Sequence, residues 1–220
     1  MTTAFFARKT REMSGFLLVI EGIDGAGKST LQRALALWCR AQGRTVVTSR
    51  EPTDGPHGKA LRQSAISGRL SPEAELDLFL KDRTEHVATV IHPALARGEV
   101  VILDRYYFST AAYQGARGLD PQAIIAANEA FAPIPDLILL LDLDPAAGHI
   151  RIGQRGTALD DFEGASYLAE VRRIFLTFDR PFIHRIDATQ EADAVLTNAR
   201  ILVEQALIGF PKSEIRNPKS

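Results

Sequence analysis

The stretch Gly22-Ile23-Asp24-Gly25-Ala26-Gly27-Lys28-Ser29 fits the phosphate-binding pattern G-x-x-x-x-G-K-[ST]. An apolar run at residues 16–20 precedes it, and a helix-period pattern over residues 28–41 follows its glycines. A strand, a glycine loop and a helix are therefore expected in the order that such a loop requires. The loop N–H groups would surround phosphate oxygens, Lys28 would add a positive charge, and the Ser29 hydroxyl could bind magnesium. The stretch predicts nucleotide binding, but it does not specify a reaction.

The composition suits one globular domain. The chain has 220 residues, of which 45% are hydrophobic, and this is enough to bury the core of one α/β domain. We expect the domain over residues 15–208, an N-terminal extension at 1–14 and a C-terminal tail at 209–220. A formal net charge of -1 argues against binding to nucleic acid or to a membrane surface. The single cysteine, Cys39, is expected to be buried, and no signal-type or membrane-spanning run is found, so a cytoplasmic location is expected.

Strand and helix patterns alternate along the chain. Besides the first run, short apolar runs typical of strands cover residues 45–48, 99–103, 136–141 and 182–186. Helix-period patterns cover residues 28–41, 71–91, 121–131 and 191–207. Because parallel neighbours need a crossover connection, this alternation predicts an α/β fold with a parallel sheet and helices on both faces.

Polar clusters follow the predicted strands at their carboxyl ends. They are Glu21 to Lys28, Arg50 to Thr53, Asp104 to Tyr106, and Asp142 with Asp144. The carboxyl ends of parallel strands meet at one edge of a sheet, which is where open α/β sheets bind ligands. Any one cluster is ordinary loop polarity, whereas the set predicts a charged crevice around bound phosphates.

Two arginines at this edge indicate a second phosphorylated ligand. Arg50 and Arg105 add more positive charge than one nucleotide needs beside Lys28, and the arginine fork suits phosphate. A structural ion pair of Arg50 with Glu51 or Asp104 is the alternative. Asp104 is also a candidate for holding magnesium through water. A phosphate monoester acceptor, with a second pKa of about 6, is largely ionised near neutral pH, so its phosphorylation needs no catalytic base.

A helix is predicted from Ser71 onward, because serine is a good cap and a proline follows it. Arg83 interrupts an apolar stripe on one face of this helix, formed by Leu76, Phe79, Leu80, Val87, Val90 and Ile91. Phe79 and Arg83 are neighbours at a spacing of four, and they offer an aromatic plane and a hydrogen-bond fork to a flat heterocycle. The alternative is that Arg83 reaches the surface or pairs with Asp82 or Glu85.

Together, these separate motifs resemble the thymidylate kinase family over residues 15 to about 207. The motifs are Glu21 to Thr30, Arg50-Glu51-Pro52, Asp82-Arg83 with His86, and Asp104 to Gly115. The resemblance implies a P-loop nucleotide kinase fold with a five-stranded sheet. It also implies transfer of a phosphoryl group from ATP to dTMP with Mg²⁺, in dTTP synthesis, by a cytoplasmic homodimer.

The resemblance implies an acceptor site in which Phe79 stacks on thymine. Arg83 and Thr110 would then hydrogen-bond to the edge of the base. Tyr113 would lie under the sugar, where a 2′-hydroxyl would clash, and Gln114 would be a further substrate contact.

The resemblance also assigns the phosphate-binding side. Asp24 would face the 3′-hydroxyl, Arg50 and Arg105 would bind the monophosphate, and Ser29 with Asp104 would hold magnesium. The implied ATP-binding residues are Gly22, Ile23, Asp24, Gly25, Ala26, Gly27, Lys28, Ser29, Thr30 and Arg151. The implied catalytic residues are Lys28, Arg105, Arg155 and Asp24.

One branch of the family carries an arginine inside the P-loop. This chain has Gly25 there and is similar to the other branch, in which a mobile lid supplies positive charges. Residues 151–163 are the candidate lid, and a plain surface loop is the alternative.

The candidate lid departs from the family pattern at two positions. Gly153 stands where related lids often have arginine, and Asp161 stands where another arginine is expected. We therefore expect Arg155 to stabilise the transition state, with Arg151 nearer the adenine.

Three other interpretations remain from the sequence. The nearest is a kinase for another nucleoside monophosphate or for a deoxynucleoside. A GTP-driven switch or a non-catalytic nucleotide-binding module is a second, although the chain has no Asn-Lys-x-Asp motif for guanine recognition. A catalytically silent relative used as a scaffold is a third, because the candidate lid has few positive charges.

Overall fold

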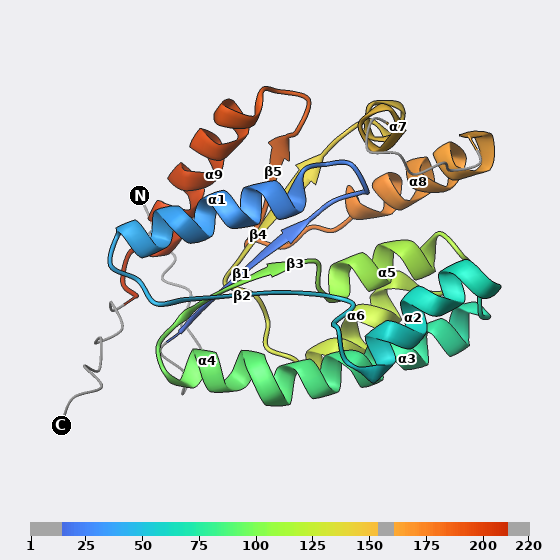
Figure 1. Cartoon of the computed structure of the whole chain (residues 1–220), viewed down its shortest axis with the longest axis horizontal. Coiled ribbons are helices and arrows are strands. Elements are labelled where there is room, and N and C mark those ends of the chain that lie inside the picture. The colour runs from blue at the N-terminus through green and yellow to red at the C-terminus, as the bar shows by residue number, and fades with distance from the viewer. Residues whose placement is uncertain (1–14, 154–160, 211–220) are drawn as a thin grey trace, which may run out of the picture.

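The computed structural model describes residues 15–153 and 161–210. Five parallel strands form one sheet in the order β2-β3-β1-β4-β5 (Figure 1). Their bounds are β1 Phe16–Glu21, β2 Val46–Arg50, β3 Val100–Asp104, β4 Leu137–Asp142 and β5 Ile183–Asp187. The predicted five-stranded parallel α/β fold is confirmed.

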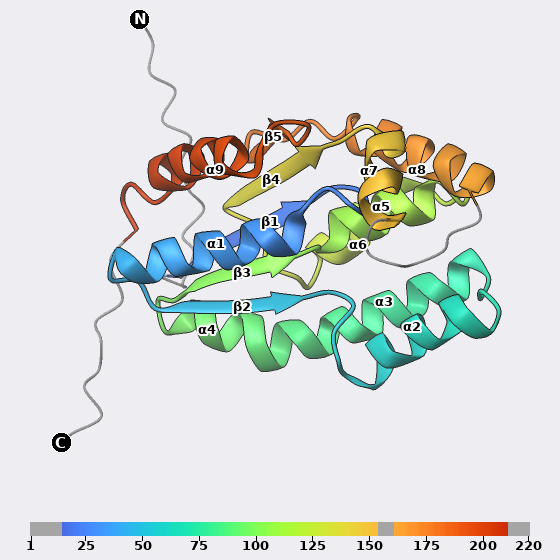
Figure 2. The ribbon, with the colours of Figure 1, turned by 45° about the horizontal axis from the view of Figure 1, so that its top comes forward.

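Helices lie on both faces of this sheet (Figure 2). On one face, α1 (Lys28–Ala41) packs against α9 (Ala192–Ala206). On the other lie α4 (His92–Ala96), α5 (Tyr107–Gly115) and α6 (Pro121–Glu129). The remaining helices are α2 (Pro56–Ser67), α3 (Pro72–His86), the π-helical turn η1 (Val87–Ile91), α7 (Pro145–Gly153) and α8 (Asp161–Phe175).

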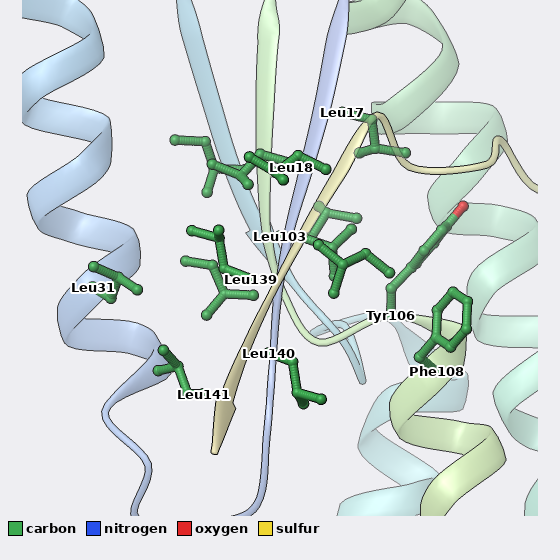
Figure 3. Close-up of a cluster of buried hydrophobic side chains, with 14 of the residues drawn as sticks. Leu17, Leu18, Leu31, Leu103, Tyr106, Phe108, Leu139, Leu140 and Leu141 are labelled. Carbon is green, nitrogen blue, oxygen red and sulfur yellow. The ribbon is translucent and has the colours of Figure 1, made fainter. Parts of the chain in front are cut away.

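The core lies between the sheet and these helices. Strands β1 and β3 are buried along their whole length, which explains why they are unbroken apolar runs rather than alternating ones. In Figure 3, Leu31 of α1 lies on one side of the sheet and Phe108 of α5 lies on the other. Cys39 is buried as expected, and burial raises the pKa of its thiol to about 11. Among the described helices, none is long and apolar enough to cross a bilayer.

The strand ends differ from the expected ones in a way that matters for the site. Each strand extends one or two residues beyond the expected run and ends on a polar residue, so that Glu21, Arg50, Asp104, Asp142 and Asp187 belong to the sheet itself. Backbone hydrogen bonds in the sheet therefore hold these residues in register. Their side chains start from a rigid edge rather than from loops.

The helix expected at 71–91 is longer than predicted, and the buried residues of its first part are charged or polar. It continues from α3 through η1 into α4, and the buried residues of α3 are Glu75, Asp82, Arg83 and His86. The apolar residues Leu76, Phe79 and Leu80 of α3 are only half-buried, whereas Val87 and Ile91 of η1 belong to the core. The buried charged residues of α3 contact polar partners, and Glu75 and Arg83 also line a cavity.

The structure describes only part of the two segments expected outside the domain. The expected extension at 1–14 and most of the expected tail at 209–220 lie outside the described residues. Phe210, at the end of the described chain, packs edge-on against Phe16 with ring centroids 4.8 Å apart. Its carbonyl oxygen accepts a hydrogen bond from Arg44 at 3.0 Å.

Candidate active site

The glycine loop connects β1 directly to α1, as the sequence predicted. Gly25 and Gly27 have φ angles of 82° and 93°, in the region that favours glycine. A Cβ atom on Gly25 would lie 2.5 Å from the carbonyl oxygen of Gly148 in α7. Any side chain at position 25, an arginine included, would therefore require α7 to move away from the loop.

Lys28 lies at the first residue of α1 and is 7% exposed. Its Nζ donates to the carbonyl oxygen of Ile23 at 2.8 Å, so that the ammonium group is held over the loop. Burial lowers the pKa of Lys28 to about 8, and the nearby Arg105 contributes to the shift. A bound anion would favour the charged form of this side chain.

Ser29 and Asp104 meet where α1 begins and β3 ends. The Ser29 hydroxyl donates to Asp104 Oδ2 at 2.5 Å. A hydroxyl and a carboxylate are hard oxygen ligands of the kind that Mg²⁺ prefers, and this ion usually takes its remaining ligands from water and substrate phosphates. In the described part of the chain, no group of three or more His, Cys, Asp or Glu side chains forms a denser metal site.

Three cavities lie along the carboxyl edge of the sheet. The first, about 460 Å³, lies between the glycine loop and residues 188–196 and includes Arg151. The second, about 300 Å³, contains Lys28, Ser29 and Asp104 and is here called the phosphate cavity. The third, about 340 Å³, is here called the acceptor cavity, and it brings together the predicted residues Phe79, Arg83, Thr110, Tyr113 and Gln114. The phosphate and acceptor cavities share the walls Asp24, Glu51, Pro52, Arg62 and Arg105.

Arg105 is held rigidly at this shared wall. It follows the last residue of β3 with a φ angle of 71°, a conformation that non-glycine residues adopt only when their surroundings enforce it. Its N–H donates to the carbonyl oxygen of Ile20 at 3.0 Å. The guanidinium donates to Asp24 at 2.6 Å, to Tyr113 at 3.0 Å and to Ser109 at 3.0 Å.

Two carboxylates near Arg105 have opposite pKa shifts. The Arg105 guanidinium, aided by Lys28, lowers the pKa of Asp24 to about 2, although the Asp24 side chain is 55% exposed. Glu21 is fully buried, and burial raises its pKa to about 7. It accepts hydrogen bonds from the N–H groups of Tyr106 and Ser109 and from the Ser109 hydroxyl. No separate role was predicted for Glu21, whose contacts link β1 to the start of α5.

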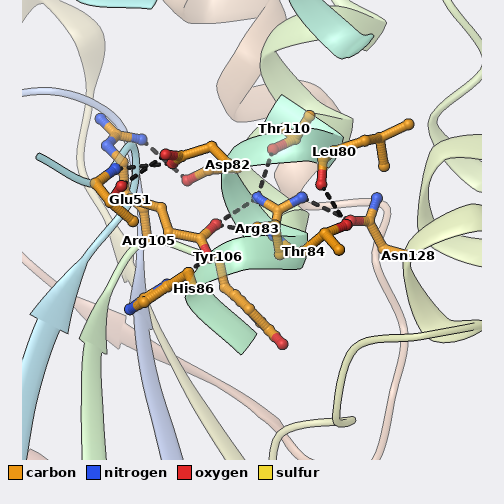
Figure 4. A network of polar contacts seen from close by, with 12 residues as sticks. Glu51, Leu80, Asp82, Arg83, Thr84, His86, Arg105, Tyr106, Thr110 and Asn128 are labelled. Atoms are coloured by element: carbon orange, nitrogen blue, oxygen red, sulfur yellow. Dashed lines mark hydrogen bonds and ion pairs between the residues drawn. The ribbon is translucent and has the colours of Figure 1, made fainter. Parts of the chain in front are cut away.

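Arg83 is buried in a network of polar contacts (Figure 4). Its guanidinium donates to Glu51 at 2.8 and 2.5 Å, to Asn128 at 2.6 Å and to Thr110 at 3.0 Å. Surface exposure of Arg83 is therefore excluded, and its acidic partner is Glu51 rather than a neighbour on α3. The sequence did not identify Asn128, because it lies 45 positions away on another helix.

The partner of Asp82 is Thr53, in the segment after β2. Asp82 accepts from the Thr53 N–H at 2.8 Å and from its hydroxyl at 2.6 Å. His86 lies between Ser49 and Glu51, with its Nε2 2.8 Å from Ser49 Oγ and its Nδ1 2.9 Å from Glu51. Thus α3 holds both ends of the segment that carries Arg50-Glu51-Pro52.

Arg50 lines the phosphate cavity, and its partner differs from the expected ones. It forms an ion pair with Asp54 at 2.9 Å, and its side chain is 62% exposed. The sequence missed Arg62, which lies at the shared wall and donates to the carbonyl oxygens of Pro52 and Thr53 at 3.0 and 2.8 Å. Arg62 belongs to α2, a helix that was not predicted from the sequence.

The candidate lid at 151–163 overlaps the end of α7 and the start of α8. Arg151 lines the first cavity, and its Nη1 donates to the carbonyl oxygen of Ala188 at 3.0 Å. Arg155, expected to stabilise the transition state, lies outside the described residues.

Comparisons with known proteins agree with this geometry. The thymidylate kinase family profile matches residues 20–199. The chain is 55% identical to a thymidylate kinase of Xanthomonas campestris pv. campestris strain B100 over 193 residues, covering 88% of this chain and 85% of the relative. It is 53% identical to a thymidylate kinase of Xylella fastidiosa strain 9a5c over 191 residues, covering 87% and 91% respectively. The chain belongs to the thymidylate kinase family.

Proposed function

We propose that this chain is a dTMP kinase that transfers the γ-phosphoryl group of ATP to dTMP, giving dTDP and ADP, in cytoplasmic dTTP synthesis. The observation that carries the proposal is the wall shared by the phosphate and acceptor cavities, to which Asp24 and Arg105 contribute. Two phosphorylated ligands, one in each cavity, would meet at this wall. Family membership and the names of the relatives support the same reaction.

The donor would lie across the glycine loop. We assign its phosphates to the loop N–H groups of residues 22–30 and to Lys28, and its adenine to the cavity that Arg151 lines. This cavity shares Gly25, Gly27 and Thr30 with the phosphate cavity. One ATP molecule could therefore occupy both cavities without a break between base and phosphates.

The acceptor would lie with its base between Phe79 and the residues that face it. We assign the edge of thymine to Arg83, Thr110 and Gln114, because all three have polar side chains and line the acceptor cavity. Tyr113, whose hydroxyl lies 3.1 Å from Asp24 Oδ2, would lie under the sugar. A base with the opposite pattern of donors and acceptors would fit this edge poorly.

Arg105 and Arg50 would bind the monophosphate of dTMP, and Asp24 would accept a hydrogen bond from the 3′-hydroxyl. Because Asp24 and Arg105 are already paired, sugar and phosphate would be aligned by one rigid unit. No general base is required, since the attacking phosphate oxygen is already ionised near neutral pH. The enzyme then contributes positioning and charge stabilisation.

Magnesium fits the oxygens of Ser29 and Asp104, which already lie together at the phosphate cavity. When bound, Mg²⁺ would offset the charge that develops on the transferred phosphoryl group. Lys28 would stabilise the same charge from the loop side. We also propose that Arg155 reaches this charge from the lid and that the enzyme works as a homodimer, both on the resemblance to the family.

A panel of acceptors tests the proposal. ADP release from ATP and Mg²⁺ is measured by a coupled assay with dTMP, dUMP, dCMP, dGMP and thymidine as acceptors. We expect dTMP to give the highest kcat/KM, and Lys28→Ala protein purified in parallel to show no acceptor-dependent release. A preference for dCMP or for thymidine would overturn the assignment of the acceptor.

A further inference from the structure

Glu75 forms a buried polar cluster at the wall of the acceptor cavity. It lies in the first turn of α3, and its side chain is 7% exposed. Its Oε2 accepts from Gln114 Nε2 and from Arg117 Nη1, both at 2.6 Å, and its Oε1 accepts from Arg69 Nε at 3.1 Å. Glu75, Gln114 and Arg69 all line the acceptor cavity. This carboxylate therefore accepts hydrogen bonds from two guanidinium groups and one amide.

The Glu75 contact determines which way round the Gln114 amide lies. An ionised carboxylate only accepts hydrogen bonds, so only the NH₂ end of the amide can face Glu75. The amide oxygen is 3.4 Å from Arg117 Nη1, which also donates to Glu75 Oε2. Glu75 and Arg117 therefore engage one edge of the amide, and the second lone pair of its oxygen is left for the base. The reversed amide would place its oxygen against the carboxylate. Because Gln114 is 1% exposed, water cannot readily supply the hydrogen bond that would then be lost.

This orientation matters because pyrimidine bases differ at the same edge. Thymine and uracil carry an N3–H donor, whereas N3 of cytosine is an acceptor beside an amino group. A fixed amide oxygen can accept from an imide N3–H but would oppose the lone pair of cytosine N3. A reversible amide could serve both.

We infer that Glu75 is a positioning residue for base selectivity: it holds Gln114 so that the amide presents an acceptor to the base and selects imide bases over cytosine. The inference rests on the proposed function and on Gln114 as a substrate contact. Arg69 and Arg117 support the arrangement by neutralising the Glu75 charge. The selectivity is thus set by a carboxylate that does not itself touch the substrate.

The variant Glu75→Gln tests this inference with little change in shape. An amide at position 75 can either donate to or accept from Gln114, so the Gln114 amide becomes free to reverse. We expect the ratio of kcat/KM for dTMP over dCMP to fall about tenfold, the value of one hydrogen bond with its partner left unmatched. The ratio of dTMP over dUMP should stay unchanged, because both bases present the same imide edge. The KM for ATP should also stay unchanged.

The control is Glu73→Gln, which removes the same charge from an exposed position in the same turn of α3. It should leave every ratio unchanged. Partial unfolding would lower the rates with dTMP and dCMP together and leave their ratio unaffected. If Glu75→Gln does not fold, Glu75→Asp keeps the charge for both arginines but is too short to hold Gln114, and the same fall is expected.

A second comparison shows whether Glu75 acts through Gln114. In a Gln114→Ala background, Glu75→Gln should no longer alter the dTMP to dCMP ratio, because the coupled partner is gone. An unchanged ratio in Glu75→Gln itself, or the same fall with and without Gln114, would overturn the inference. If the parent enzyme prefers dCMP, the proposed function fails instead, so the two failures are distinguishable.

Discussion

Asp24 and Arg105 form an ion pair of 2.6 Å across the wall between the phosphate and acceptor cavities. They are 81 positions apart in sequence. The sheet brings them together, because Ile20 in β1 lies beside Asp104 in β3 and both strands end near this point. The pair is therefore part of the sheet edge, although both residues belong to connecting segments.

Removing the charge of Asp24 should break its ion pair with Arg105, which we propose aligns the sugar and the phosphate of dTMP. We expect Asp24→Asn to lower kcat/KM for dTMP by roughly ten to a hundredfold, as for the loss of a hydrogen bond between charged groups, with little change in the KM for ATP. Steady-state kinetics with each substrate varied in turn measures this. The control is Asp77→Asn, in an exposed pair with Lys81, which should have no effect. A loss below twofold in Asp24→Asn would contradict the role of the pair.

Asp24 should also contribute no pH dependence to activity in the usual assay range. Its pKa of about 2 keeps it ionised above pH 4.

Glu21 should make the protein less stable as the pH rises. Its pKa is about 7 in the folded protein against 4.5 for an unperturbed glutamate, so the folded state binds more protons between these values. The free energy of unfolding is then highest below pH 4.5, and it falls by up to ~3 kcal/mol as the pH rises through 7. Urea unfolding at several pH values measures this slope. Glu21→Gln should flatten it and Glu73→Gln should not; equal slopes in Glu21→Gln and the parent would contradict the prediction.

The Arg83 network should make a large contribution to stability. Replacing Arg83 by alanine leaves the buried Glu51 charge without its guanidinium partner, a change that typically costs about 3–5 kcal/mol. Urea unfolding of Arg83→Ala should show this loss, together with a raised KM for dTMP. The control is Arg97→Ala, which removes an exposed guanidinium that pairs with Glu99 and should lower the free energy of unfolding much less, as is usual for ion pairs at the surface. A similarly small cost for Arg83→Ala would mean that Glu51 finds another partner.

The sheet and the phosphate loop could be predicted because their signals are local. The glycine loop lies within eight consecutive residues, and strands β1, β3 and β4 are unbroken apolar runs up to their last residue. The grouping of Asp24, Arg50 and Arg105 also followed from the sequence, since parallel strands must finish at one edge. The expected residues of the acceptor cavity came from the family resemblance, and the structure brings them together.

Other parts of the site depend on contacts between distant segments. Glu51 and Arg83 are 32 positions apart, and Glu75 and Gln114 are 39 apart, so no local pattern links them. Burial of a charged face on α3 cannot be predicted from hydrophobic periodicity, which assumes that buried positions are apolar. Arg62 was missed for a different reason, because no helix was predicted over α2.

The Tyr113 hydroxyl should contribute to discrimination against ribonucleotides. It donates to Asp24 Oδ2 at 3.1 Å and accepts from Arg105 at 3.0 Å, and burial raises its pKa, so it stays neutral and fixed at assay pH. If Tyr113 lies under the sugar as proposed, its fixed hydroxyl leaves no room for a 2′-hydroxyl, whereas Tyr113→Phe would open space for one oxygen atom.

We expect Tyr113→Phe to lower the ratio of kcat/KM for dUMP over UMP by roughly three- to tenfold. Using two substrates with the same base isolates the sugar from base recognition. The matched control is Tyr167→Phe on α8, whose hydroxyl donates to the Tyr113 carbonyl oxygen at 2.9 Å. It removes the same atom from the same region without opening space beside Asp24, and it should leave the ratio unchanged. If both variants lower the ratio equally, the effect comes from looser packing of α5, and the Tyr113 hydroxyl does not exclude the 2′-hydroxyl directly.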